Sequence, residues 1–409
     1  MTRTRTRLTA WCLFAATFVA PVALDGQVAV RGKVVHTLAG PPIEDGMILV
    51  RDGKIAAVGK ASDLAVPDDF RLLEAAVVTP GLIDAHSVVG LAGQFNYAHD
   101  QDQIERSTPM QPELRAVDAY NPRERLVAWL RSFGVTTLHT GHAPGELISG
   151  QTMIVKTRGD TVEAATIVET AAVATTLSSD ARKGKGKSPG TRGKMVAMLR
   201  AQLIKAKEYA DKRQSAKEDE KPPRDLGLDV LVRVLERQLP LLVTAQKAQD
   251  IASTLRLAVE FDVRVVLDGA AESYLLVDAI KAAAVPVILH PSMARAHEDL
   301  ENLSFETASV LRRAGIPIAL QSGYESYVPK TRVVLFEGAI AAANGLTFEE
   351  ALATITIDAA RILGIDHRVG SLVVGKDGDL ALYDGDPFEY TSHCVGVVIE
   401  GEVVSEEKR

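Results

Sequence analysis

Residues 238–290 read QLPLLVTAQKAQDIASTLRLAVEFDVRVVLDGAAESYLLVDAIKAAAVPVILH, and this stretch decides the fold. Three short apolar runs, at 238–245, 263–269 and 285–290, are separated by two segments in which apolar residues recur with helical spacing. Strands that are apolar on both sides belong to a sheet whose two faces are both covered. The alternation therefore predicts parallel strands joined by helical crossovers.

The same unit recurs on both sides of this stretch. Upstream, 134–140 (GVTTLHT) is strand-like, and 191–214 has the length and periodicity of a long helix. Downstream, 305–315 (FETASVLRRAG) predicts a helix and 316–322 (IPIALQS) predicts a strand. So many units favour a closed sheet over an open one. We predict an α/β fold with a (β/α)8 TIM-type barrel over 79–369.

The two ends of the chain differ from its middle, because both are rich in short strands. Residues 28–78 and 370–404 contain β-prone runs, with hairpin dipeptides such as Asp45-Gly46 and Asp52-Gly53 between them. Each end has too few strands to be stable alone. We therefore predict that the two ends pair into one small composite β-sandwich beside the barrel.

The first 26 residues have the pattern of an export signal. Arg3, Arg5 and Arg7 precede an apolar run over 8–24, which ends at Asp25-Gly26. This order of charge, short apolar core and small residues is typical of a secretory signal peptide. The alternative is a retained membrane anchor, for which 17 residues with a proline are marginal. We expect a signal peptide at 1–26, export to the periplasm or the cell exterior, and no membrane span after cleavage.

The charge balance and the cysteines exclude several classes of protein. The 409-residue chain has 46 basic and 53 acidic residues, which gives a net charge of −7. Such a surface repels phosphate backbones, so we expect no nucleic-acid partner. Cys12 and Cys394 are the two cysteines, near opposite ends of the chain. Neither a disulfide framework nor a cysteine-based zinc site can be built from them.

Four segments carry a resemblance to a known family. VVTPGLIDAHS at 77–87 resembles the first barrel strand of the amidohydrolase superfamily, which ends in His-x-His. Segments 134–160, 302–323 and 345–387 resemble its imidazolonepropionase-like branch, the last through the run GSLVVGKDGDL. The resemblance implies a zinc-dependent hydrolase of C–N bonds in non-peptide or dipeptide amides. Imidazoles and a carboxylate at the strand ends would hold the metal, and an aspartate would move the proton.

The sequence departs from this pattern at almost every ligand position. His86 holds the first place, but Val88 holds the second, and an isopropyl group cannot bind a metal. The other substituted positions are Thr244 and Gln246 on the fifth strand, Gly269 after Asp268 on the sixth, and Gly323, flanked by Gln321 and Tyr324, in place of the eighth-strand aspartate. Neutral hydroxyl and amide groups do not replace imidazole for zinc. We therefore predict a degenerate homologue with lost or strongly reduced catalysis and no firm metal site.

Strand ends in a parallel barrel meet at one face, which predicts a single pocket there. The predicted pocket residues are His86, Val88, Thr244, Gln246, Asp268, Gly269, His290, Gln321 and Tyr324. The alternative is an active, divergent amidohydrolase with a non-standard metal site. Its candidate ligands are His86, His139, His142, Asp268 and His290, which offer adequate chemistry for zinc.

Three further residues and the partners complete the predictions. Lys156 is comparable with the carboxylated lysine that bridges two metals in some relatives, or it is an ordinary strand-edge lysine. Glu272 is interpreted as a cap of the helix that follows it. Metal-free hydrolysis by Ser322 with His290 is a third reading, although no nucleophile-elbow pattern surrounds Ser322. We expect a small-molecule ligand in the barrel mouth, and either a homo-oligomer or pairing with an active relative.

Overall fold

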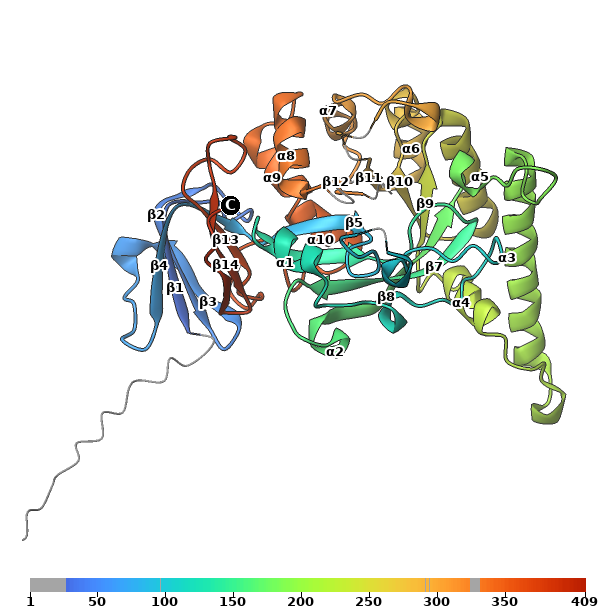
Figure 1. Cartoon of the computed structure of the whole chain (residues 1–409), viewed down its shortest axis with the longest axis horizontal. Helices are drawn as coiled ribbons and strands as arrows, with labels where there is room; N and C mark the ends of the chain where they lie inside the picture. Colours follow the sequence, from blue (N-terminus) through green and yellow to red (C-terminus); the bar gives the residue numbers. More distant parts are fainter. Residues whose placement is uncertain (1–26, 96, 291, 294, 324–331) are drawn as a thin grey trace, which may run out of the picture.

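The computed structural model describes residues 27–95, 97–290, 292–293, 295–323 and 332–409. Within them the chain forms a barrel sheet and a smaller β domain, which lie side by side (Figure 1). No helix in this part of the chain has the length and apolar character needed to cross a membrane. The predicted signal peptide at 1–26 and the predicted pocket residue Tyr324 lie outside the described residues.

The barrel sheet has eight strands, and their order in the sheet follows the sequence. They are β5 (Leu82–Ser87), β6 (Val135–Thr140), β7 (Ile148–Lys156), β8 (Thr166–Thr176), β9 (Leu241–Ala245), β10 (Val265–Gly269), β11 (Val287–Leu289) and β12 (Ile318–Leu320). A bridge between Ser87 and Gly323 joins the two edges of the sheet. The predicted barrel is therefore confirmed.

Helices connect most of these strands and cover the outside of the sheet (Figure 1). In chain order they are α1 (Arg125–Arg131) before β6, α3 (Arg192–Ser215) and α4 (Leu226–Leu235) before β9, α5 (Ala248–Phe261), α6 (Val277–Ala283) and α7 (Thr307–Arg313) before the next three strands, and then α8 (Val334–Ala343), α9 (Phe348–Thr354) and α10 (Ile357–Leu363). The predicted alternation of strand and helix over 238–290 is confirmed, and β9, β10 and β11 are buried along their whole length.

One barrel strand runs against its neighbours, which the sequence pattern does not predict. β7 pairs antiparallel with both β6 and β8. A parallel connection needs a crossover of about a dozen residues or more. Only residues 141–147 and 157–165 separate β7 from β6 and β8, and the second link contains just the one-turn helix α2 (Val162–Ala165). Links this short force the chain to reverse direction.

The period of two along each strand decides which side chains reach the barrel mouth. Leu242, Val266, Ile288 and Ala319 belong to one buried cluster in the barrel interior. The residue two positions further along a strand faces the same way. Thr244, Asp268, His290 and Gln321 therefore follow these interior residues at the carboxyl ends of the strands.

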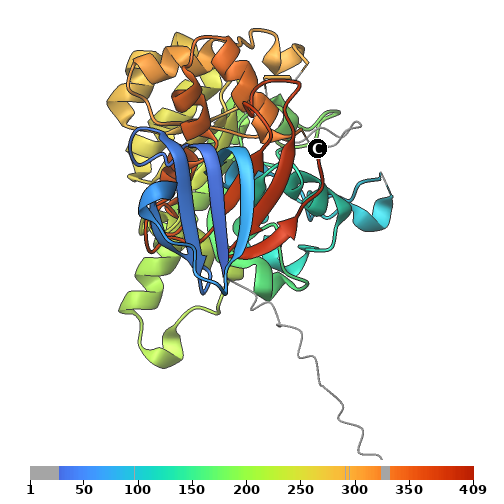
Figure 2. The ribbon, with the colours of Figure 1, turned by 90° about the vertical axis from the view of Figure 1, so that its left-hand side faces the viewer.

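The β domain is one continuous seven-stranded sheet built from both ends of the chain (Figure 2). Its strands are β1 (Val28–Val35), β2 (Ile43–Arg51), β3 (Lys54–Lys60), β4 (Arg71–Pro80), β13 (Leu380–Tyr383), β14 (Cys394–Ile399) and β15 (Glu402–Ser405). β13 pairs antiparallel with β4, so Leu382 lies opposite Val78. Side chains from β1, β2, β3, β13 and β14 share one hydrophobic core. The predicted pairing of the two ends is confirmed.

The β domain passes directly into the barrel, since Gly81 alone separates β4 from β5. A Cβ atom at this position would lie 2.2 Å from Oγ1 of Thr136, so only glycine fits there. This link sets the start of β5, the strand that carries His86.

Candidate functional site at the barrel mouth

The Asp268 carboxylate is the centre of a buried hydrogen-bond network at the barrel mouth. His86 Nδ1 lies 2.8 Å from its Oδ1, and Gln321 Nε2 donates to the same oxygen at 2.8 Å. The Thr244 hydroxyl donates to Oδ2 at 2.5 Å. All four side chains are buried. The ends of four different barrel strands are thus tied together through a single carboxylate.

His86 and Asp268 form a buried ion pair. Burial opposes a charge on the imidazole, but the Asp268 carboxylate outweighs it and raises the pKa of His86 above its usual value. Burial likewise opposes ionisation of Asp268, yet His86 and the hydrogen bonds from Thr244 and Gln321 together lower its pKa. The two shifts favour imidazolium and carboxylate together. The other ring nitrogen, His86 Nε2, is buried and has no hydrogen-bond partner.

A second carboxylate, Asp84, supports the same strand ends and was missed from the sequence. Its Oδ1 accepts the backbone N–H of Ser322 at 3.0 Å, and its Oδ2 accepts the Ser322 hydroxyl. Burial raises the pKa of Asp84 to about 6. Asp84 lies in the edge strand β5 and Ser322 follows β12 at the other edge, so this contact helps to close the barrel. The Ser322 hydroxyl is therefore committed to Asp84 rather than to His290, which argues against the serine-nucleophile reading.

Gly269 and Gln246 stand at positions where the family has histidines on the sixth and fifth strands, and the two residues compete for the same space. A Cβ atom at Gly269 would lie 2.3 Å from Nε2 of Gln246. Gly269 also has a φ of +75°, which residues with a side chain rarely adopt. The Gln246 side chain is held in place because its Oε1 accepts the N–H of Ala271 at 3.2 Å. Gln246 therefore occupies the space that a side chain at position 269 would need.

The remaining substituted positions have local structural roles. Val88 is buried in a small apolar cluster with Ala92 and Ala143. Gly323 has a φ of +66°, and its N–H donates to the His86 carbonyl at 3.3 Å. An aspartate at this position would be strained in the present backbone. Neither position offers a group that could bind a metal or accept a proton.

The other predicted histidines do not complete a ligand set. Both ring nitrogens of His139 are engaged, Nδ1 with the Ala85 carbonyl and Nε2 with the Thr152 hydroxyl, each at 2.7 Å. Burial lowers the pKa of His139 to about 3 and that of His142 to about 4. His290 follows β11, and its N–H donates to the Gly269 carbonyl. Among the residues that the structure describes, no group of three or more His, Cys, Asp or Glu side chains is placed to hold a metal.

Lys156 and Glu272 have structural partners away from the Asp268 network. The buried Lys156 ammonium pairs with the Asp379 carboxylate and lies 3.0 Å from Oδ2 of Asp377, which ties β7 to the run GKDGDL. It is therefore not placed to bridge metals. Glu272 Oε2 accepts the N–H of Ala248, so it caps α5, the preceding helix, rather than the following one as expected.

Glu337 on α8 is a further buried acid that the sequence analysis did not single out. Its Oε2 accepts the N–H of Ser292, in the segment after β11, while its Oε1 is buried without a hydrogen-bond partner. Burial raises the pKa of Glu337 to about 7. A glutamate on an apolar helix was the available signal, but its depth depends on how α8 packs.

The architecture is that of a TIM-type barrel with a composite β domain, and its polar groups lie at the carboxyl ends of the strands, where TIM-barrel enzymes have their active sites. The comparisons agree. A family model described as "Amidohydrolase family" matches residues 311–405. A crystal structure of an amidohydrolase from Thermotoga maritima MSB8 superposes with a TM-score of 0.87 and 27% identity, covering 93% of this chain and 100% of that one.

Relatives in sequence point to one branch of this superfamily, the imidazolonepropionases. The chain is 24% identical to an imidazolonepropionase of Rhizorhabdus wittichii over 404 residues, covering 87% of this chain and 92% of the relative. It is 44% identical to an imidazolonepropionase of Shewanella sp. strain MR-4 over 78 residues, covering 18% of this chain and 19% of the relative. The match thus spans about a fifth of the Shewanella enzyme. Together these matches support an imidazolonepropionase-like member of the amidohydrolase superfamily.

Proposed function

We propose that this chain is an amidohydrolase homologue that has lost metal-dependent hydrolysis and holds a small molecule at its barrel mouth. The observation that carries the proposal is the position of Asp268, whose carboxylate is surrounded by donors from His86, Thr244 and Gln321. A metal site needs deprotonated ligands around a cation. Here the arrangement is inverted, with an anion at the centre and donors around it.

The residues present do not fit the zinc that the family implies. Gln246 and Thr244 are neutral, weak ligands, and His86 already uses Nδ1 to hold Asp268. Turnover would also need a base to accept the proton of the attacking water. Gly323 has no side chain in that place, and Gln321 cannot act as the base because a neutral carboxamide does not accept a proton; its Nε2 donates to Asp268.

One observation favours the alternative, an active divergent amidohydrolase. His86 Nε2 is buried and has no hydrogen-bond partner. The centroids of the His86 and His139 rings are 5.7 Å apart. A rearrangement that freed His139 from Thr152 would create two adjacent imidazoles. The present hydrogen bonds of His139 oppose this, because both of its nitrogens are in use.

Hydrolysis assays separate the two proposals. The purified chain is incubated with N-acetyl amino acids, dipeptides and a cyclic imide, with chelator or with added zinc. We expect no release of product above the rate of a His86→Gln variant under either condition. Zinc-dependent turnover that chelator abolishes and zinc restores would instead establish the divergent enzyme. Export of the chain, and its pairing with a second copy or an active relative, remain predictions from the sequence.

A further inference from the structure

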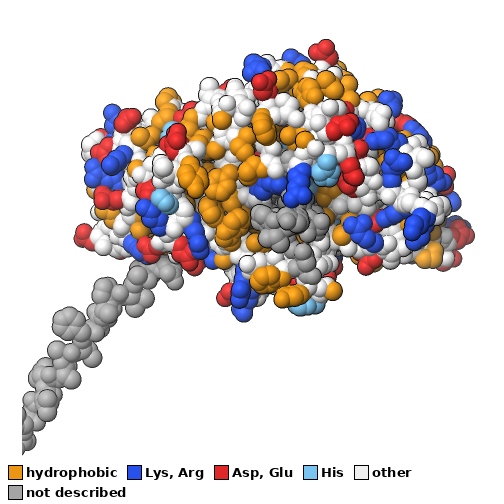
Figure 3. All heavy atoms as spheres, turned by 45° about the horizontal axis from the view of Figure 1, so that its top comes forward, with side chains coloured by type: hydrophobic (Ala, Val, Ile, Leu, Met, Phe, Trp, Pro, Cys, Tyr) orange, Lys and Arg blue, Asp and Glu red, His pale blue; other side chains and the backbone are white. Residues whose placement is uncertain are grey.

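The stretch from residue 181 to residue 207 is strongly basic in a chain that is acidic as a whole. It contains nine Lys and Arg residues and no Asp or Glu, whereas the whole chain has a net charge of −7. The rest of the chain therefore carries a net charge of −16. The stretch forms the loop after β8 and the first two-thirds of α3, at the end of the molecule opposite the β domain (Figure 1). Figure 3 shows many Lys and Arg side chains at this same end.

Most of these cations have no acidic partner. Lys183, Arg192 and Arg200 are paired with carboxylates. The other six are exposed and make no ion pair with any residue that the structure describes, namely Arg182, Lys185, Lys187, Lys194, Lys205 and Lys207. Their charge is therefore available to an anionic partner outside the molecule.

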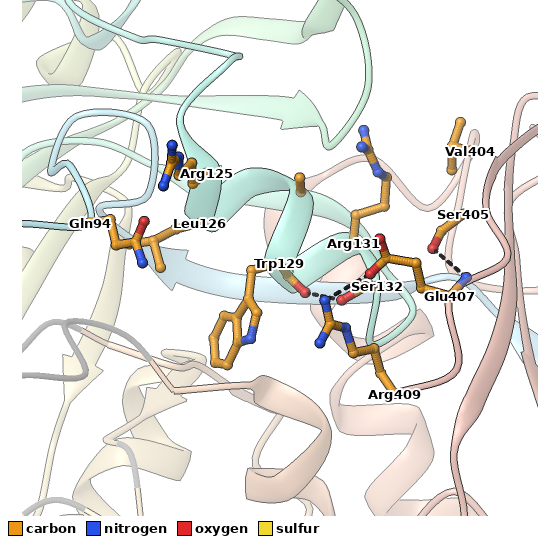
Figure 4. Close-up of a pocket in the computed structure, with 11 residues that line it drawn as sticks. Gln94, Arg125, Leu126, Trp129, Arg131, Ser132, Val404, Ser405, Glu407 and Arg409 are labelled. Atoms are coloured by element: carbon orange, nitrogen blue, oxygen red, sulfur yellow. Dashed lines mark hydrogen bonds and ion pairs between the residues drawn. The ribbon is translucent and has the colours of Figure 1, made fainter.

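The basic side chains around α1 are arranged differently. A cavity of about 580 Å³ lies there, and Arg125, Arg131 and Arg409 belong to its lining. Arg125 and Arg131 point in different directions from the helix, and Arg409 is paired with Glu407 at 2.8 Å (Figure 4). Positive charge is thus dispersed around α1, whereas it is concentrated along α3.

The exposed face of α3 carries a narrow apolar ridge. An α-helix turns by about 100° per residue, so Ala197, Ala201 and Ile204 fall on one line along it. All three are exposed, and Ile204 has 45% of its surface accessible. The other face of α3, which includes Leu199 and Leu203, is buried, and the helix packs against α4 and α5. The ridge therefore faces away from the protein.

Unpaired lysines lie on both sides of this ridge. Lys194 and Lys205 are eleven residues apart, which is close to three helical turns, so they share one side. Lys207 lies on the other side of Ile204 by the same geometry. At the N-terminal end of the helix, the exposed Lys187 in the preceding loop extends the basic surface.

An apolar ridge between lysines suits the surface of an anionic bilayer. Such a surface attracts the ammonium groups, while the methylene stems of the lysines and the Ile204 side chain can enter the headgroup region. A nucleic-acid duplex would attract the same cations but offers no apolar phase to Ile204. Residues 181–207 also contain no aromatic side chain on which single-stranded bases could stack. The arrangement therefore favours lipid over nucleic acid.

We propose that the outward face of α3 and the basic loop before it dock this protein on a membrane surface that contains anionic lipid. The contact is peripheral, with α3 lying along the surface. None of the cations that carry the proposal takes part in the Asp268 network, so the docking is independent of the function proposed for the barrel mouth.

Sedimentation with sucrose-loaded vesicles tests the docking. The full chain is mixed with vesicles of phosphatidylcholine alone, or with about 30% phosphatidylglycerol, at low and at high salt. We expect at least about tenfold more binding to the anionic vesicles at low salt, and its loss at about 0.5 M NaCl, where charges are screened within a few ångströms. Binding through the apolar run at 8–24 would not depend on vesicle charge.

Two variants with the same net charge locate the contact. Replacing Lys194, Lys205 and Lys207 together by Gln should weaken binding to the anionic vesicles by more than about tenfold. The matched control replaces three exposed cations outside α3 by Gln, namely Lys33, Lys60 and Arg125, and should bind like the parent. Circular dichroism checks the fold, and Lys185→Gln with Lys187→Gln takes the place of the first variant if that variant does not fold.

Ile204→Ser separates lipid from other anionic partners. It should weaken vesicle binding about threefold by removing apolar contact with the headgroup region. Equal binding to neutral and anionic vesicles would overturn the proposal, as would equal binding of the α3 variant and its control. The proposal also fails if Ile204→Ser binds vesicles like the parent, or if a DNA duplex of about 30 base pairs binds at least as tightly per phosphate as the anionic vesicles.

Discussion

The Asp268 carboxylate lies 2.8 Å from Nδ1 of His86, and both side chains are buried at the barrel mouth. His86 matches the first ligand position of the family motif. In this chain, however, its imidazole faces the Asp268 carboxylate rather than a metal position. The pair therefore serves as a structural element of the barrel mouth, and its removal should be measurable as a loss of stability.

Asp268→Asn should destabilise the chain by about 3–5 kcal/mol, because it removes one partner of a buried ion pair and leaves the other without compensation. The free energy of unfolding is measured by urea denaturation at pH 6. Asp278→Asn, at an exposed acid on α6, is the matched control and should change stability by less than about 0.5 kcal/mol. Equal effects of the two substitutions would contradict the structural role of Asp268.

The pH dependence of this pair has a definite sign. The raised pKa of His86 gives stability that is full below its ordinary value of 6.5 and is lost as pH rises through the folded-state value. The lowered pKa of Asp268 gives stability that is present above 3.8 and is lost as pH falls. The stability difference between the parent and His86→Gln should therefore be largest between these values and decline at alkaline pH. A difference that grows steadily toward pH 9 would show that His86 is neutral in the folded chain.

The Glu337 carboxyl should destabilise the chain when it ionises, in contrast to the Asp268 carboxyl. Burial raises its pKa from 4.5 to about 7, so its contribution to stability is full below 4.5 and declines as pH rises toward 7. Glu337→Gln keeps a carbonyl acceptor for the Ser292 N–H and removes the charge. At pH 8 the variant should be more stable than the parent by roughly 1–3 kcal/mol, with the gain vanishing near pH 4. The unfolding of the parent and the variant is compared by thermal denaturation between pH 4 and pH 8. A variant that is less stable than the parent at pH 8 would refute the expectation.

Restoring a histidine at position 269 alone should damage the fold. The φ of +75° strains any side chain, and the new Cβ would lie 2.3 Å from Gln246 Nε2. We expect Gly269→His to cost about 2–4 kcal/mol and to bind no metal, as read by denaturation and zinc titration. Adding Gln246→Ala should recover part of the loss by removing the contact but not the backbone strain. Wild-type stability of Gly269→His would show that the segment rearranges freely.

Much of the fold follows from the sequence because strand period and burial act locally. The apolar strands around residue 242 and residue 266 predict both the barrel and the residues that continue inward at its mouth. The reversal of β7 was not predictable in this way, because strand direction depends on link lengths that matter only once both neighbours are recognised. Two features of the site depend on side-chain geometry between strands that are distant in the sequence. They are the hydrogen-bond partners of Asp268 and the position of the Gln246 side chain beside Gly269. Sequence spacing does not contain that information.

The zinc content of the purified chain tests most directly whether the metal centre is lost, as we propose. The full chain is produced in medium supplemented with zinc, exchanged into metal-free buffer, and measured by plasma mass spectrometry beside the Asp268→Asn and His86→Gln variants. We predict far less than about one zinc per chain, with no difference among the three proteins. About one zinc per chain in the parent, lost in His86→Gln, would contradict the account.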